Sequence, residues 1–111
     1  MKVSYEDFIG VDIRSGTIIK VHDFPRAIKP AFKIWADFGN EVGVLQTSAQ
    51  VTVNYTPDDL LGKLILGCVN LPEKNIAGFK SEFLLLGCAD KEGNICLASV
   101  DPEVKNGKKL F

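Results

Sequence analysis

The segment spanning residues 11–22 constrains the fold most, because two sets of side chains alternate along it. One face carries Val11, Ile13, Ser15, Thr17, Ile19 and Val21. The other face carries Asp12, Arg14, Gly16, Ile18, Lys20 and His22. A two-residue period over this length predicts a long, half-buried β-strand. Gly16 in its middle indicates the bend or bulge that a strongly coiled barrel strand needs.

Shorter elements are predicted along the rest of the chain. Strands are expected over residues 32–38, 42–49, 64–70, 82–89 and 95–100, with a loop over residues 71–81. In the first of these, Phe32, Ile34, Ala36 and Phe38 are expected to face inward, and Lys33, Trp35 and Asp37 outward. Short helices are expected at residues 3–8, capped by Ser4, and from Thr56, where Pro57 occupies the first turn.

This order of elements predicts the fold. Three strands, a short helix and two or more further strands are typical of the OB-fold, a five-stranded Greek-key barrel. We therefore expect an all-β protein with short N-terminal and inter-strand helices and a C-terminal extension. The chain has 111 residues and no repeat or linker, so residues 1–111 are expected to form one domain.

Two segments, residues 64–69 and 83–89, are apolar without alternation, so both faces of each strand should be covered. A barrel interior covers only one face. The second face is covered either by the chain's own terminal segments or by a partner subunit. Both interpretations stay open, and the second predicts a homodimer.

The charge balance limits how this chain could bind nucleic acid. Its net charge is −1, so a nucleic-acid site must be a local basic patch. Such a patch is suggested between residues 14 and 33, where five basic residues accompany one acid. No stretch has the length and apolarity of a membrane span, and two acids follow closely on the N-terminus, unlike a secretory signal. We expect a cytoplasmic protein that does not enter a membrane.

The sequence offers no catalytic or metal-binding constellation. Cys68, Cys88 and Cys96 lack CxxC spacing, and His22 is the only histidine. We expect no cofactor, no metal and no enzymatic activity. Reduced cysteines acting as small core hydrophobes are the favoured interpretation. The alternative is that Cys88 and Cys96 face each other across a hairpin and pair.

Three separated motifs resemble the tRNA-binding domain family, whose members include small OB-fold proteins and domains appended to methionyl- and phenylalanyl-tRNA synthetases. They are DIRSGTI at residues 12–18, NLPEKNIAG at 70–78 and GFKSE at 78–82. The phrase IAGFKSE, with DFG at 37–39 and SAQ at 48–50, is similar to a stand-alone, dimeric branch associated with protein export and chaperone-like activity. The resemblance implies an OB barrel, a homodimer, no catalysis, and an RNA-binding face near the loop after the fourth strand.

The residues around that loop can serve RNA binding. Lys74 and Lys80 flank Gly78, which would let backbone approach a phosphate closely. Asn70 and Ser81 could hydrogen-bond phosphate, ribose or base edges. Lys29 and Lys33 are expected to neutralise further phosphates of tRNA or another structured RNA. The structural alternative is that Gly78 serves a turn and Ser81 pairs with backbone.

Two other functions remain open on the sequence. The first is chaperone-like binding of unfolded polypeptides or export-bound clients through an apolar groove at the dimer surface, near Trp35 and Phe79. Trp35 could equally stack an RNA base or fill a dimer contact. The second is an accessory domain that docks to a synthetase or to a protein-export component.

Overall fold

A computed structural model describes all residues from 1 to 111. The helices are α1 (Tyr5–Ile9), α2 (Gly39–Val42) and α3 (Pro57–Leu60). The strands are β1 (Ile13–Asp23), β2 (Phe32–Asp37), β3 (Val44–Ala49), β4 (Leu64–Cys68), β5 (Lys74–Ile76), β6 (Phe79–Ser81), β7 (Leu84–Leu85), β8 (Gly87–Ala89) and β9 (Ile95–Leu97). No helix is long and apolar enough to pass through a membrane.

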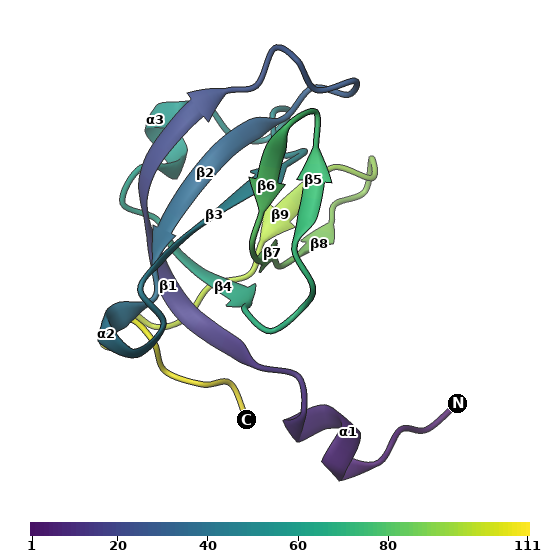
Figure 1. Cartoon of the computed structure of the whole chain (residues 1–111), viewed down its shortest axis with the longest axis vertical. Helices are drawn as coiled ribbons and strands as arrows, with labels where there is room; N and C mark the ends of the chain where they lie inside the picture. Colours follow the sequence, from purple (N-terminus) through teal and green to yellow (C-terminus); the bar gives the residue numbers. More distant parts are fainter.

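One curled antiparallel sheet forms most of the molecule (Figure 1). Its five strands lie in the order β3-β2-β1-β4-β7, and the hairpins β5–β6 and β8–β9 complete the strands. The backbone N–H of Glu82 donates to the carbonyl of Gln46 on β3, at 2.8 Å, so the sheet nearly closes on itself. The predicted five-stranded, all-β barrel of the OB type is confirmed.

Strand β1 joins the two halves of the barrel. Its first half, up to Thr17, pairs with β4, and its second half, from Thr17 to Asp23, pairs with β2. The register shifts between Ile18 and Lys20, as at a β-bulge, which returns Val21 to the core after Ile18. Gly16 supplies the close approach, since a Cβ there would lie 2.8 Å from the Phe38 ring. The predicted long, bent strand is therefore present.

The core fills the interior of the barrel. It comprises Ile18, Phe32, Ile34, Ala36, Phe38, Val51, Leu60, Ile65 and Phe83. The rings of Phe38 and Phe83 meet edge to face, with centroids 4.9 Å apart. All four residues predicted to face inward between residues 32 and 38 belong to this cluster.

Three local predictions are wrong. The strand expected over 42–49 begins only at Val44, because Gly39 adopts a φ of +85° and opens the single turn of α2. The loop expected over 71–81 contains the hairpin β5–β6. The strand expected over 82–89 is divided, because Leu86 N donates to Leu66 O on β4, while Leu86 O accepts from Ala98 N after β9. The chain thus changes pairing partner at Leu86.

The two doubly apolar segments have different surroundings. Strand β4 is buried from Ile65 to Cys68, so this chain covers both of its faces. In the second segment Phe83 is buried, but the Leu84 side chain is 51 % exposed, and Gly87, Cys88 and Ala89 are exposed. The first segment is therefore covered by the chain itself, whereas the second leaves apolar surface exposed to solvent.

Candidate nucleic-acid interface

Aromatic rings and lysines gather on the outer side of β1 and β2, in what we call the cation–aromatic face. It is formed by Lys20, His22, Phe24, Lys33, Trp35 and Phe79, of which Phe24 is buried and Trp35 and Phe79 are half-buried. The rings make a continuous edge-to-face series. Trp35 lies 5.0 Å from His22 and 5.9 Å from Phe79, and Phe79 lies 5.5 Å from Phe24, between ring centroids. Such contacts hold the rings in place against one another.

Two lysines cover the faces of these rings. Lys20 Nζ lies 4.4 Å from the Trp35 ring centroid. Lys33 Nζ lies 4.8 Å from the Phe24 ring and 5.0 Å from the Phe79 ring. All three distances suit cation–π attraction. The only salt bridges of the chain are those of Arg14, so no carboxylate neutralises Lys20 or Lys33.

Strand register explains how these residues meet. Lys20 is opposite Trp35 and His22 is opposite Lys33 across the β1–β2 pair. Side chains directly opposite in an antiparallel pair lie on one face. Sequence reasoning placed Lys33 and Trp35 outward but missed Lys20 and His22 as their neighbours. Lys20 and His22 could have been identified by pairing the strand predicted over residues 11–22 with the strand predicted over residues 32–38.

The hairpin β5–β6 carries two more lysines, which its register places on opposite faces. Its register pairs Lys74 with Ser81, and Lys80 with Asn75. The hairpin is tied to the sheet through Gln46, whose Oε1 accepts from Trp35 Nε1 at 3.1 Å and whose Nε2 donates to Lys80 O at 2.8 Å. Lys74 and Lys80 are both exposed.

Gly78 has a conformational role in this hairpin. Ala77 and Gly78 have φ values of 49° and 84°, as both central residues of a type I′ turn require. The Asn75 side chain accepts from Gly78 N at 2.9 Å and closes the turn. Gly78 thus serves a turn, as the structural alternative to phosphate binding predicted.

Asn70 and Ser81 form hydrogen bonds within the protein. Asn70 Oδ1 accepts from Asp12 N at 2.9 Å, and its Nδ2 donates to Gly10 O at 2.8 Å. Ser81 Oγ lies 2.8 Å from Thr47 Oγ1 and accepts from Ser48 N at 3.4 Å. Ser81 holds β6 against β3. Asn70 joins β4 to the end of α1 and forms no part of the lysine cluster.

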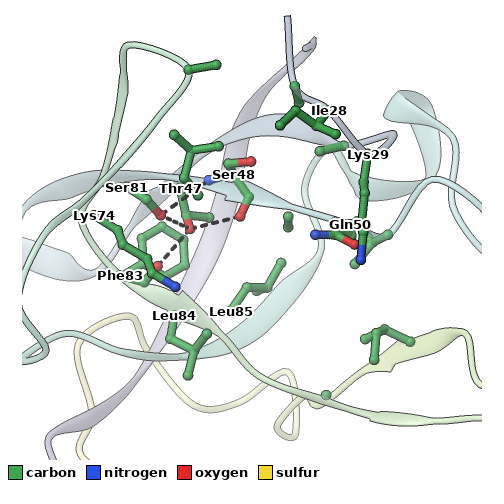
Figure 2. Close-up of a pocket in the computed structure, with 18 residues that line it drawn as sticks. Ile28, Lys29, Thr47, Ser48, Gln50, Lys74, Ser81, Phe83, Leu84 and Leu85 are labelled. Carbon is green, nitrogen blue, oxygen red and sulfur yellow. Dashed lines mark hydrogen bonds between the residues drawn. The ribbon is translucent and has the colours of Figure 1, made fainter. Parts of the chain in front are cut away.

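A groove of about 720 Å³ lies between the β1–β2 loop, β3 and the β5–β6 hairpin (Figure 2). Its lining is mainly apolar and includes Ile28, Val51, Leu84 and Leu85. Lys29 and Lys74 enter it from opposite sides. Trp35 and Phe79, which the sequence suggested for peptide binding, do not line it. The structure therefore separates Lys29 from the cation–aromatic face and these two rings from the groove.

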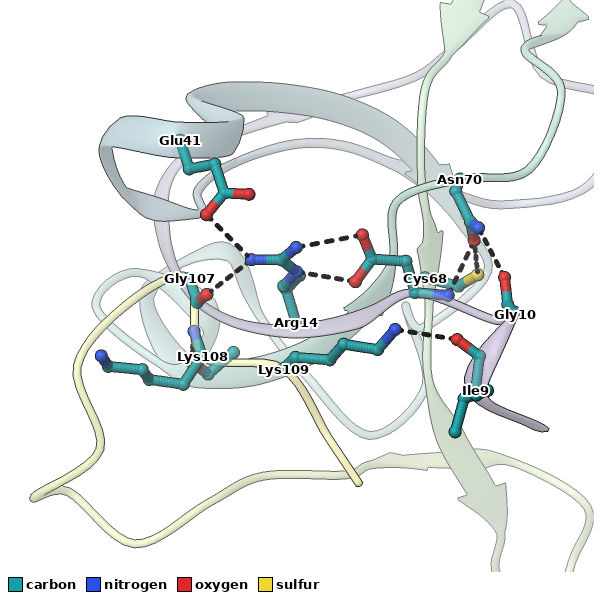
Figure 3. A network of polar contacts seen from close by, with 11 residues as sticks. Ile9, Gly10, Arg14, Glu41, Cys68, Asn70, Gly107, Lys108 and Lys109 are labelled. Carbon is teal, nitrogen blue, oxygen red and sulfur yellow. Dashed lines mark hydrogen bonds and ion pairs between the residues drawn. The ribbon is translucent and has the colours of Figure 1, made fainter. Parts of the chain in front are cut away.

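A polar network joins the end of α1 and the C-terminal tail to β1 (Figure 3). Arg14 donates from Nε and Nη2 to the two carboxylate oxygens of Asp12, at 2.6 and 3.2 Å, and from Nη1 to Gly107 O at 3.0 Å. Lys109 Nζ donates to Ile9 O at 2.8 Å. The hydrogen bond from Arg14, with its positive charge, lowers the pKa of the Asp12 carboxyl. Arg14 is thus engaged in holding the C-terminal tail.

Comparison with known proteins gives consistent matches along the chain. Residues 13–109 match the family model described as "Putative tRNA binding domain". The crystal structures of chaperone CsaA from Bacillus anthracis and from Picrophilus torridus are 41 % and 42 % identical. Each superposes with a TM-score of 0.92, covering 100 % and 99 % of this chain and 100 % of the CsaA chain.

Curated relatives include much longer proteins. The methionine–tRNA ligase of Thermococcus onnurineus is 38 % identical over 108 residues. That stretch is 97 % of this chain and 14 % of the ligase. The methionine–tRNA ligase of Methanocaldococcus jannaschii is 33 % identical over 100 residues, 90 % of this chain and 15 % of the ligase. The chain therefore spans about one-seventh of the length of these relatives.

Proposed function

Since the chain belongs to the tRNA-binding domain family and is a CsaA-like member of it, we propose that it binds tRNA or another structured RNA and catalyses no reaction. The observation that carries this proposal is the cation–aromatic face, where unpaired lysine charges and aromatic rings share one surface. Lysines supply phosphate contacts, and the partly exposed rings of Trp35 and Phe79 supply stacking for unpaired bases. With a net charge of −1, the chain must concentrate its binding on such a patch.

The lysines divide into two groups in this proposal. Lys20 and Lys33 on the sheet contact phosphates along one surface, and Lys80, on the hairpin face opposite Phe79, contacts RNA that passes over the hairpin. Lys29 and Lys74 contact RNA that extends over the groove. Gly78 allows the tight turn that presents the hairpin, and nothing in its surroundings would meet an added Cβ, so RNA backbone can approach it. Ser81 and Asn70 do not contact RNA in this proposal. Ser81 holds β6 against β3, and Asn70 holds the end of β4 to Gly10 and Asp12.

A titration with bulk tRNA at two salt concentrations tests this function. The variant Lys33→Gln/Lys80→Gln should bind more weakly, and the slope of log K against log salt should fall by about 0.7–0.9 for each phosphate that the variant no longer neutralises. Lys91→Gln, an exposed lysine in the β8–β9 turn, is the matched control and should bind like the unmodified protein. Absence of tRNA binding at about 50 mM salt, where such contacts are strongest, would overturn the proposal.

We also propose that the protein acts as a cytoplasmic homodimer. Helix α1 buries none of its residues, and Tyr5, Phe8 and Ile9 are 70 %, 40 % and 43 % exposed. The helix lies away from the barrel (Figure 1). A second copy that covers α1 and the exposed Leu84 would remove this apolar surface from water. Light scattering at micromolar concentration should give twice the 12.1 kDa chain mass. A monomer mass would contradict it.

A second function is supported by the groove. Its volume of about 720 Å³ and its apolar lining suit a segment of unfolded polypeptide, and the similar CsaA proteins are named chaperones. Export-bound polypeptides or export components would be partners of this activity. An unfolded peptide that competes with tRNA would indicate overlapping sites. Peptide binding that Leu85→Asp abolishes, with tRNA binding unchanged, would place the peptide in the groove.

A further inference from the structure

Two cysteines lie directly opposite each other in the β8–β9 hairpin. The register pairs Cys88 with Cys96. Backbone hydrogen bonds join Ala98 N to Leu86 O at 3.0 Å and Asp90 N to Asn94 O at 2.7 Å, two residues away on either side. Cys88 and Cys96 therefore occupy a hydrogen-bonded position, where Cα atoms are about 5.5 Å apart. A disulfide spans Cα separations of roughly 4.4–6.8 Å, but it brings the two Cβ atoms to about 3.5–4.5 Å, closer than the roughly 5.5 Å of a hydrogen-bonded pair, so closing it requires the two strands to shift.

The side chains of this pair are open to solvent. Both Cys88 and Cys96 are exposed, whereas the third cysteine, Cys68, is buried in β4. Opposed residues of an antiparallel pair project from the same face of the hairpin. This corrects the expectation that all three cysteines act as core hydrophobes, because only Cys68 does so.

The hairpin holds the two thiols in register before any reaction. Asp90 Oδ1 accepts from Glu92 N and from Asn94 N, both at 2.9 Å, and closes the turn. Asn54 Nδ2 donates to Asp90 Oδ2 and to Ile95 O, both at 3.1 Å, and lies 3.6 Å from Cys96 Sγ. Asn54 thus fixes the hairpin and the Cys96 sulfur together. Preorganisation of this kind makes bond formation between the sulfurs an intramolecular step.

We propose that Cys88 and Cys96 form a reversible redox site that accepts oxidising equivalents from a low-molecular-weight disulfide of the glutathione type. One cysteine loses its proton and attacks the glutathione disulfide, which gives a mixed disulfide and releases one glutathione thiolate. The second cysteine loses its proton and attacks the mixed disulfide, which releases the second glutathione thiolate. The protein pair loses two electrons, glutathione disulfide gains them, and the thiolates take up the two protons.

The place of this site in the fold suggests what its oxidation changes. Gly87 and Ile95 of the same hairpin line the apolar groove. A covalent link between β8 and β9 would hold that wall of the groove closed against local opening. The cation–aromatic face lies on other strands, so we expect tRNA affinity to change by less than about twofold, within measurement error of about 0.4 kcal/mol. Exposed disulfides are also the more easily reduced ones, which suits a reversible site.

The test uses the whole chain in glutathione buffers of increasing oxidised fraction. We expect two of the three thiols to disappear together, with a mass decrease of two hydrogen atoms and one free thiol at Cys68. Proteolytic mapping should join the peptides of Cys88 and Cys96, and dithiothreitol should restore both thiols. Cys68→Ser should behave the same way with no free thiol left.

The single variants Cys88→Ser and Cys96→Ser provide the contrast. Each should stop at the mixed disulfide and gain the mass of one glutathione. The proposal is overturned if the unmodified protein keeps all three thiols in fully oxidised buffer. It is equally overturned if it accumulates only glutathione adducts or intermolecular cross-links. Because the readout is thiol content, failure here would leave the tRNA titration unaffected.

Discussion

The chain contains two nearly identical pentapeptides that fold differently. They read LILGC at residues 64–68 and LLLGC at residues 84–88. The first forms β4 without interruption and is buried from Ile65 onward. The second is divided between β7 and β8, and its last two residues are exposed. Local sequence supplies apolar strands in both cases, so the neighbouring elements decide which one is covered.

The neighbours of the two pentapeptides account for the difference. Strand β4 lies between β1 and β7 in the sheet. Gly67 abuts the rings of Phe38 and Phe83 on the core side, while Leu66 on the other side lines a cavity together with Val100 and Val104 of the C-terminal tail. The second pentapeptide leaves β4 at Leu86 to pair with β9, and no further element of this chain covers it.

The two pentapeptides should differ most in how much stability is lost when one of their aliphatic side chains is truncated. Ile65→Ala empties a fully buried site and should lower the free energy of unfolding by about 2–5 kcal/mol. Leu84→Ala removes a side chain that is 51 % exposed and should cost less than about 1 kcal/mol. Urea unfolding at one fixed protein concentration measures both. Equal decreases in the two variants would mean that the second pentapeptide is covered as fully as the first.

The sequence was sufficient for the barrel and for much of its core, because those depend on patterns within single strands. Phe32, Ile34, Ala36 and Phe38 follow the two-residue period and are all buried. The cation–aromatic face could not be predicted in full. Phe24 and Phe79 meet there from segments far apart in the chain, and neither belongs to an alternating run that points to the other. Asn70 and Ser81 were placed among ligand groups because sequence does not show their internal hydrogen bonds.

The fourth residue of each pentapeptide is a glycine, Gly67 or Gly87, and the two glycines should respond differently to an added methyl group. A Cβ at Gly67 would lie 2.8 Å from the rings of Phe38 and Phe83, which can shift, so Gly67→Ala should cost about 1–3 kcal/mol of global stability. A Cβ at Gly87 would lie 2.5 Å from the backbone carbonyl of Cys96. Gly87→Ala should therefore separate β8 from β9 locally. Amide hydrogen exchange should show reduced protection confined to the hairpin, and reduced protection throughout the barrel would contradict this.

Cys68 and Cys88 end the two pentapeptides. Replacing them should change the free energy of unfolding only slightly, whereas the reactivities of the two thiols should differ strongly. Cys68→Ser places a hydroxyl in a buried site, where Asn70 Oδ1, 3.5 Å from the sulfur, is an available acceptor, so the variant should be less stable by about 1 kcal/mol. Cys88→Ser is exposed and should change stability by less than about 0.5 kcal/mol. Iodoacetamide should label Cys88 and Cys96 in the folded protein and Cys68 only in urea. Rapid labelling of Cys68 in buffer would contradict the burial of β4.

The smallest expected contrast concerns the carboxylates beside the two pentapeptides. Asp12 lies next to β1, the partner of β4, and Asp90 follows β8. The pKa of Asp12 is lowered by the Arg14 hydrogen bond, and that of Asp90 by the Asn54 hydrogen bond. Because both pKa values are lower in the folded protein, each carboxylate stabilises the folded state at any pH above the pKa of an unfolded carboxyl, about 3.9. This contribution is lost as the pH falls through the pKa of the folded state.

Acid unfolding of Arg14→Met and Asn54→Ala compares the two carboxylates. Arg14→Met should flatten the fall in stability below about pH 4, by less than about 1 kcal/mol because the pair is partly exposed, and high salt should reduce the difference. Arg14→Met also removes the hydrogen bond to Gly107, which lowers stability equally at every pH, so the slope is the informative quantity. Asn54→Ala should alter the slope less, since Asp90 is exposed and keeps its backbone donors in the turn. If the stability of Arg14→Met instead runs parallel to that of the unmodified protein as pH falls, the Asp12–Arg14 ion pair at the start of β1 contributes no pH dependence.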